Sequence, residues 1–163
     1  MKTYYPLEDI ESVVSILSRI SVWGGLTDAQ QAKIYKRLEV GTFEKGEYIF
    51  RKGEQPSHIY ILKNGKINLL TSDHEVSLQK ETVLTGGCFG VAALMAMQTH
   101  MVTAVAIEET EVMVLSRQAL LGLYEEDLEL FALLMMNIAR EIARRLKLTD
   151  DILLQYVRTH KDW

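Results

Sequence analysis

Between residues 40 and 115, glycines and turn pairs divide the chain into short segments rich in β-branched and aromatic residues. The dividing positions are Gly41, Gly46, Gly53, Asn64-Gly65, Ser72-Asp73 and Gly86-Gly87. The segments between them are residues 48–50, 59–62, 67–70, 76–78, 102–107 and 112–115. Many short strands at close spacing are typical of a sandwich or barrel. This stretch is therefore predicted to be all-β.

Asn64-Gly65 gives the strongest turn signal within this stretch. The pair stands between two strand-like segments, and Asn-Gly favours the positive φ angles of a type I′ turn. We therefore expect a two-residue hairpin at this point.

A helical pattern precedes the β stretch. After Pro6, which suits a helix start, apolar residues recur at helical spacing. They are Leu7, Ile10, Val13, Val14 and Leu17. Thr27 and Gln30 have the spacing of a capping box, which predicts a short helix that reaches about Leu38 and buries Ile34 and Leu38.

A second helical pattern follows the β stretch. Ser116 is predicted to cap a short helix, and residues 127–156 then contain neither glycine nor proline. Apolar residues there keep the four-three seam spacing of a coiled coil: Met135, Ala139, Ile142, Leu146, Thr149, Leu153 and Tyr156. A second apolar flank comprises Leu130, Leu133, Leu134 and Ile138. We expect one flank to pack on the β domain and the seam to pair with a second chain; packing within one chain alone is the alternative.

Composition narrows the function classes. The 163 residues carry a net charge of −4 and 48% hydrophobic residues, which fits one globular domain and argues against a protein that mainly grips nucleic acid. One cysteine excludes an internal disulfide framework and a Cys-based zinc site. The N-terminus lacks the character of a signal peptide, and no apolar run approaches the ~20 residues of a membrane span. We therefore expect a cytoplasmic protein with no membrane partner.

Four segments carry a resemblance to the cyclic nucleotide-binding domain, the sensor half of cyclic-AMP receptor proteins and of kinase regulatory subunits. Residues 43–54 (FEKGEYIFRKGE) resemble the first β-roll signature, and residues 58–67 (HIYILKNGKI) resemble the next hairpin. Residues 86–90 (GGCFG) are similar to the opening of the phosphate-binding cassette, and residues 108–115 (EETEVMVL) resemble the last strand before the C-terminal helices.

The resemblance implies an α+β, mainly β fold in a single domain over residues 1–163. A jelly-roll or double-stranded β-helix roll is expected at about residues 40–115. It would follow N-terminal helices at about 7–38 and precede C-terminal helices at about 116–157, the last of them long.

The resemblance also defines a candidate ligand site and two departures from the family pattern. In the family, cassette N–H groups bind the cyclic phosphate, a glutamate binds the ribose 2′-hydroxyl, and an arginine pairs with the phosphate. Here Val91 takes the glutamate's place and His100 the arginine's, and no arginine lies between Arg51 and Arg117. Valine cannot accept a hydrogen bond, and an imidazole of pKa about 6.5 is mostly neutral at pH 7. We therefore expect no tight binding of cyclic AMP or cyclic GMP. The candidate ligand-binding residues are Gly86, Gly87, Cys88, Phe89, Gly90, Val91, Ala92, Ala93, His100, Met101, Val102 and Thr103.

Catalysis, metal binding and DNA binding have no support in the sequence. No nucleophile or phosphate-loop motif of an enzyme is present, and the histidines lack metal-ligand spacing. Cys88 is interpreted as a small buried hydrophobe rather than a redox switch. Transcription factors of the family continue into a helix-turn-helix domain, whereas this sequence ends soon after the predicted helix, so direct DNA binding is not expected. Four basic residues of the predicted long helix form a patch that is interpreted as solvated surface: Arg140, Arg144, Arg145 and Lys147.

Two classes of function remain. In the first, a small ligand enters the roll and shifts the C-terminal helix, so that the domain is a regulatory sensor. In the second, the pocket is vestigial and the protein is a constitutive dimeric interaction module.

Overall fold

The structure, a computed structural model, describes residues 2–72 and 77–160. The strands are β1 (Tyr5–Pro6), β2 (Glu39–Phe43), β3 (Tyr48–Phe50), β4 (His58–Asn64), β5 (Ile67–Ser72), β6 (Ser77–Val83), β7 (Cys88–Phe89), β8 (Thr103–Ala106) and β9 (Thr110–Ser116). The helices are α1 (Ile10–Val14), η1 (Leu17–Arg19), η2 (Ser21–Trp23), α2 (Asp28–Tyr35), α3 (Val91–Ala96), α4 (Arg117–Glu126) and α5 (Leu128–Thr159). The expected turn at Ser72-Asp73 and the strand at 76–78 lie partly outside the described residues, and His74 lies wholly outside them.

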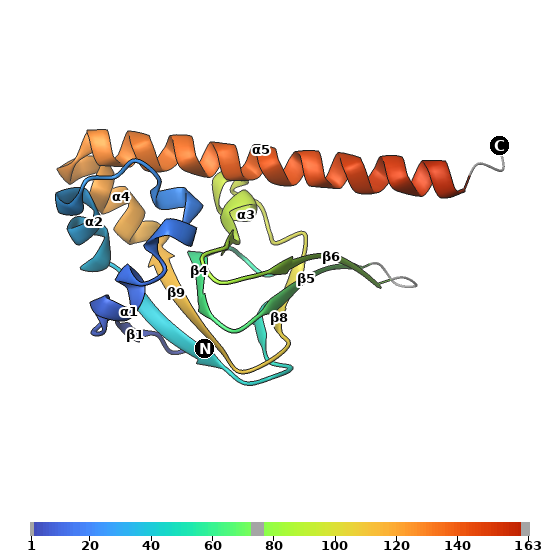
Figure 1. The fold of residues 1–163 in the computed structure, drawn as a ribbon, viewed down its shortest axis with the longest axis horizontal. Helices are drawn as coiled ribbons and strands as arrows, with labels where there is room; N and C mark the ends of the chain where they lie inside the picture. The colour runs from blue at the N-terminus through green and yellow to red at the C-terminus, as the bar shows by residue number, and fades with distance from the viewer. Residues whose placement is uncertain (1, 73–76, 161–163) are drawn as a thin grey trace.

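The strands form two antiparallel sheets, with the orders β1-β2-β9-β4-β7 and β3-β8-β5-β6. From β2 to β5 the chain changes sheet at each successive strand, so the two sheets wrap around each other as a roll (Figure 1). The longest register in the first sheet joins β4 to β9, with Tyr60 opposite Val114. The predicted mainly β roll with N-terminal helices and a long C-terminal helix is confirmed.

The predicted hairpin at Asn64-Gly65 is wrong. β4 pairs with β7 and β9, whereas β5 pairs with β6 and β8, so this turn carries the chain from one sheet to the other. Gly65 does adopt a positive φ of 93°, and a Cβ there would lie 2.5 Å from the Glu109 carbonyl oxygen. The Asn-Gly pair specifies a sharp change of direction, but the partner of the next strand depends on distant residues.

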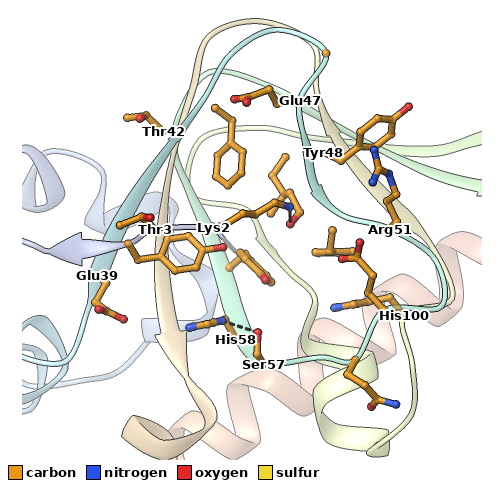
Figure 2. A pocket seen from close by; sticks show the side chains of 18 residues that line it. Lys2, Thr3, Glu39, Thr42, Glu47, Tyr48, Arg51, Ser57, His58 and His100 are labelled. Atoms are coloured by element: carbon orange, nitrogen blue, oxygen red, sulfur yellow. Dashed lines mark hydrogen bonds between the residues drawn. The ribbon is translucent and has the colours of Figure 1, made fainter.

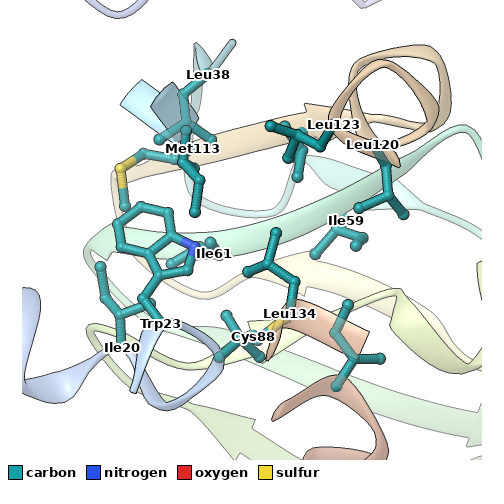
Figure 3. Close-up of a cluster of buried hydrophobic side chains, with 14 of the residues drawn as sticks. Ile20, Trp23, Leu38, Ile59, Ile61, Cys88, Met113, Leu120, Leu123 and Leu134 are labelled. Atoms are coloured by element: carbon teal, nitrogen blue, oxygen red, sulfur yellow. The ribbon is translucent and has the colours of Figure 1, made fainter. Parts of the chain in front are cut away.

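Apolar side chains collect on both faces of the first sheet. Ile59, Ile61, Met113 and Leu115 pack with the helices in one cluster, part of which Figure 3 shows. Tyr60, Leu62, Val112 and Val114 point into the roll and form a second cluster with the other sheet. β4 is therefore buried on both faces between the helices and the roll interior, which explains why its central residues do not alternate with polar ones.

The N-terminal region differs most from expectation. Tyr5 and Pro6 pair with β2 instead of starting a helix. The helix α1 is shorter than expected, and its N-cap residue Asp9 accepts a hydrogen bond from the Ser12 N–H. The strand β2 was not expected, because Gly41 interrupts its apolar pattern; a Cβ at Gly41 would lie 2.7 Å from the Tyr4 ring.

The predicted capping box and its buried residues are confirmed. Thr27 accepts from the backbone of Gln30, whose side chain accepts in return from the Thr27 backbone. Ile34 and Leu38 are buried, although the helix itself ends at Tyr35.

The long C-terminal helix is confirmed as α5, which Asp127 caps through the Leu130 N–H. Its first half lies across the helical layer, and its second half extends beyond the roll (Figure 1). The flank residues Leu130, Leu134 and Ile138 are buried against the domain. On the seam, by contrast, Leu146 is 63% exposed and Leu153 is 58% exposed.

Candidate functional site

The glycine loop leads from β6 through β7 into the short helix α3. Cys88 and Phe89 pair with Ile61 and Tyr60 of β4. Gly90 then turns the chain with a φ of 76°, and a Cβ there would lie 2.7 Å from the Tyr60 ring. The loop therefore needs glycine at this position, because any side chain would meet both an unfavourable φ and an aromatic ring.

The cassette residues point to two different cores. Cys88, Val91 and Leu94 are buried in the cluster that packs against the helices, whereas Phe89 is buried inside the roll. Ala92 is exposed and Ala93 is half-buried. Val91, expected from the sequence resemblance at the place of a ribose-binding glutamate, thus supplies hydrophobic packing and no polar atom.

His100 is the buried imidazole of the site. It is 2% exposed, its ring stacks on Phe50 with centroids 3.7 Å apart, and its Nε2 has no hydrogen-bond partner. Burial lowers the pKa of His100, with nearby Glu54 opposing that change and Lys2 adding to it. The ring is therefore neutral at pH 7 and cannot replace the permanent charge of an arginine.

The three residues after His100 lie in three different environments. Met101 is exposed, Val102 packs on the roll interior, and the Thr103 hydroxyl accepts from the Lys52 N–H at 3.0 Å.

A cleft of about 1160 Å³ opens at the edge of the roll between β2, β3 and the start of β4 (Figure 2). We call it the roll cleft. Of the twelve candidate ligand-binding residues, His100 alone lines it. Its walls carry aromatic rings and charges of both signs: Lys2, Tyr4, Glu39, Phe43, Glu47, Tyr48, Phe50, Arg51, Glu54, His58 and Tyr60. Six of these residues lie within residues 43–54, a stretch that was interpreted from the sequence only as a fold signature; the others come from the N-terminal segment, β2 and β4 and meet that stretch only in the folded chain.

A smaller cleft of about 300 Å³ lies on the other side of the cassette, beside Gly86 and Gly87. Four charged residues that line it form an ion-pair cluster, which we call the cassette latch: Glu81, Glu141, Arg144 and Arg145.

The latch joins α5, β6 and the glycine loop. The Arg145 Nε lies 3.3 Å from Glu81 and 3.2 Å from Glu141, and its guanidinium also donates to the Cys88 carbonyl oxygen. Arg144 lies 3.0 Å from Glu81 and 2.9 Å from Glu141. Two cations of the expected solvated patch are therefore paired, and their acidic partner Glu81 is more than sixty residues away in sequence.

Replacing Glu141 with glutamine is expected to lower the free energy of unfolding by about 2 kcal/mol, since it leaves half-buried guanidinium groups with one carboxylate fewer. Glu141 is 6% exposed. Asp150→Asn, which removes an exposed carboxylate from the interior of the same helix, is the control and should change the stability little.

The same variant should change the pH dependence of stability. Burial raises the pKa of the Glu141 carboxyl, but the hydrogen bond from Arg144 and the charges of Arg145 and Arg144 outweigh it, so the pKa lies below its ordinary value of 4.5. This contribution is present above pH 4.5 and is lost as the pH falls through the lower folded value. Urea unfolding from pH 7 to pH 3 should therefore show a steeper acid loss for the wild type than for Glu141→Gln. Parallel curves would contradict this role.

The part of the chain that the structure describes offers neither a metal site nor a reactive thiol. Within residues 2–72 and 77–160 no group of three His, Cys, Asp or Glu side chains is placed to hold a metal ion. Burial raises the pKa of the Cys88 thiol to about 12, Arg145 and Glu141 having smaller opposing influences, which disfavours the reactive thiolate. In the same described part, no helix has the length and apolar character needed to cross a membrane.

Comparison with known proteins places the roll in one family. The family described as Cyclic nucleotide-binding domain matches residues 40–127. A cGMP-dependent protein kinase 2 from Homo sapiens is 31% identical over 123 residues, which is 71% of this chain and 16% of the kinase. A cGMP-dependent protein kinase from Plasmodium berghei is 30% identical over 65% of this chain and 12% of the kinase. The chain thus spans only a small part of these relatives.

Solved structures share the fold. A cyclic nucleotide-binding domain from Methylobacillus flagellatus superposes with a TM-score of 0.81 at 16% identity, over 95% of this chain and 88% of that one. The Thermus thermophilus catabolite activator protein gives 0.73 at 24% identity, over 85% of this chain and 63% of that one. A mutant regulatory subunit of a cAMP-independent protein kinase A from Trypanosoma brucei, bound to cAMP in its A site, gives 0.68 at 20% identity, over 80% of this chain and 46% of that one.

Proposed function

Since the chain belongs to the cyclic nucleotide-binding domain family, we propose that it is a non-catalytic regulatory module that takes a small ligand into its roll and signals through α5, without tight binding of cyclic AMP or cyclic GMP. The observation that carries the proposal is the chemistry at the two positions that hold the nucleotide in the family. Val91 is packed among apolar side chains, and His100 is buried and stacked on Phe50.

A cyclic phosphate in a partly closed site needs a charged partner, since an unpaired buried charge costs several kcal/mol. The candidate ligand-binding residues, from Gly86 to Thr103, contain neither an arginine nor a lysine. The Trypanosoma brucei neighbour is described as the regulatory subunit of a cAMP-independent kinase, and the form of it described with bound cAMP is a mutant. This supports the proposal that a domain of this fold need not depend on cyclic AMP.

Signalling through α5 is supported by the cassette latch. Arg145 of α5 contacts the Cys88 carbonyl, and Asn137 of α5 donates to the carbonyls of Val22 and Gly24 at 3.1 and 2.9 Å. A ligand that moved the glycine loop would therefore act on α5 directly.

A thermal-shift series separates the sensor from the alternative, a ligand-free dimeric interaction module. Cyclic nucleotides, cyclic dinucleotides, nucleotides, haem and organic acids are each added to the purified chain. A ligand that binds the folded state raises Tm, and the rise grows with the ratio of ligand concentration to Kd. Loss of that shift in a variant of the roll would indicate that the ligand binds there. An unchanged Tm with every compound would favour the module.

Homodimerisation through α5 is part of both proposals. The exposed seam residues Leu146 and Leu153 would be covered by the same helix of a second chain. Replacing both with glutamate should raise the dimer dissociation constant at least about 100-fold, because each buried leucine contributes about 2 kcal/mol. Gln155→Glu, also exposed and on α5, adds charge without removing apolar surface and is the control. Light scattering at about 100 micromolar protein should give the molar mass of a dimer for the wild type and the control, and that of a monomer for the double variant. A monomeric wild type at this concentration would contradict dimerisation through the seam.

A further inference from the structure

An ammonium group of the chain itself already occupies the roll cleft. The Lys2 Nζ donates to the Ile49 carbonyl oxygen of β3 and lies 5.5 Å from the centroid of the Phe43 ring of β2. Figure 2 shows the Lys2 side chain reaching into the middle of the cleft from the N-terminal segment. A backbone acceptor and an aromatic face are the groups that an organic cation seeks in a protein.

Further acceptors surround this position. Glu54 and Glu47 line the cleft and act on Lys2 as opposite charges, while Arg51 acts as a like charge. His100 lines the same cleft and is only 2% exposed. Its Nε2 has no hydrogen-bond partner. A neutral imidazole can accept a hydrogen bond through one ring nitrogen, so the cleft holds an unused polar group beside the ammonium.

Charge also favours a cation over an anion. Apart from Lys2, the lining includes the carboxylates of Glu39, Glu47 and Glu54 and one guanidinium, that of Arg51. That guanidinium lies 4.3 Å from the Tyr48 ring centroid, over its face. A small anion would therefore meet an excess of negative charge once Lys2 left.

The segment that delivers Lys2 lies at the edge of the first sheet. β1 is two exposed residues long, with Tyr5 opposite Val40 and Pro6 opposite Glu39. Tyr4 packs its ring 5.0 Å from that of His58. A short edge strand of this kind detaches at low free-energy cost compared with the core strands.

We propose that the roll cleft is a binding site for a small organic ammonium, and that Lys2 occupies it as a tethered competitor. This inference deepens the proposed function and rests on it for the idea that the roll takes a ligand. The ligand would place its ammonium between the Ile49 carbonyl, the Phe43 face and Glu54, and its stem along the aromatic wall. Because a group tethered by a short segment competes at an effective concentration of about millimolar, Lys2 would raise the apparent Kd of the ligand.

The test titrates n-butylammonium chloride into the wild type and into Lys2→Met at constant ionic strength. Binding is followed by the chemical shifts of the His100 ring in NMR spectra and by calorimetry. We expect Lys2→Met to bind at least about tenfold more tightly than the wild type, as removal of a tethered competitor requires. Lys52→Met, which removes an exposed lysine outside the cleft lining, is the matched control and should behave as the wild type.

Two further arms complete the test. Glu54→Gln in the Lys2→Met background should weaken the binding of n-butylammonium several-fold, and sodium butyrate should leave the His100 signals of every variant unmoved. Equal affinity in the wild type and Lys2→Met, or a preference for butyrate, would overturn the proposal. Circular dichroism of each variant verifies that the fold is kept.

The outcome also separates this inference from the sensor proposal. If n-butylammonium binds Lys2→Met while the NMR signals of α5 and the oligomeric state stay unchanged, the ammonium site stands and the sensor proposal fails. If a different compound stabilises the roll while n-butylammonium leaves the His100 signals unmoved, the sensor proposal stands and the ammonium site is wrong.

Discussion

Gly86→Ala is expected to lower the free energy of unfolding by about 4 kcal/mol, from a strained backbone and an overpacked contact acting together. Gly86 has a φ of +85°, and a Cβ there would lie 2.5 Å from both the Cβ and the carbonyl oxygen of Arg19. Its N–H also donates to the Leu62 carbonyl at 2.7 Å, so the loop cannot shift without breaking a bond to β4. The glycine loop is therefore fixed from two sides.

Gly25→Ala supplies the matched control. Gly25 has a similar φ of +77°, but a Cβ there would have no neighbour within 4 Å. It should therefore lose only the backbone contribution, about 1 kcal/mol. Urea unfolding followed by circular dichroism measures both variants, and equal losses would contradict the close packing of Gly86 against Arg19.

Phe89→Ala is also expected to lower the free energy of unfolding by about 4 kcal/mol, because it removes a fully buried ring from the roll interior. Phe89 stacks on Tyr60 with centroids 5.2 Å apart and lies 6.0 Å from Phe50, which in turn stacks on His100. The cavity left behind would be bounded by strands of both sheets, which cannot close on it without changing register.

Phe89→Leu tests whether the loss comes from volume. Leucine keeps most of the apolar surface, so about 1 kcal/mol should be lost. The same unfolding experiment compares the two variants. A loss for Phe89→Ala as small as that for Phe89→Leu would mean that Phe89 does not support the roll.

Local chemistry predicted the local elements. The Thr27–Gln30 capping box, the Ser116 cap and the glycine-free run of α5 all depend on residues within a few positions of one another, and all are found in the structure. The β-rich segments between the glycines were recognised for the same reason.

Long-range arrangement could not be read from the same signals. Asn64-Gly65 indicates a turn, yet only the partners of β5 decide that it crosses between sheets. Glu81 meets Arg145 through the packing of α5 on the roll, and nothing near either residue in the sequence marks the other.

The sequence predicted the glycine loop, but of the twelve candidate ligand-binding residues only His100 lines the roll cleft. Val91 packs in the helical core and His100 stacks against Phe50, and a ligand role for these residues stays a prediction. The roll cleft, with Lys2 inside it, was missed because its residues come from the N-terminal segment and three separate strands.

Calorimetric titration of the purified chain with cyclic AMP and with cyclic GMP tests the central claim most directly. Because the candidate ligand-binding residues from Gly86 to Thr103 include neither an arginine nor a lysine, we expect no saturable heat for either nucleotide at concentrations up to about 1 mM, the range in which binding contributes only about 4 kcal/mol. Saturable binding of either nucleotide with a Kd in the micromolar range or below would contradict it.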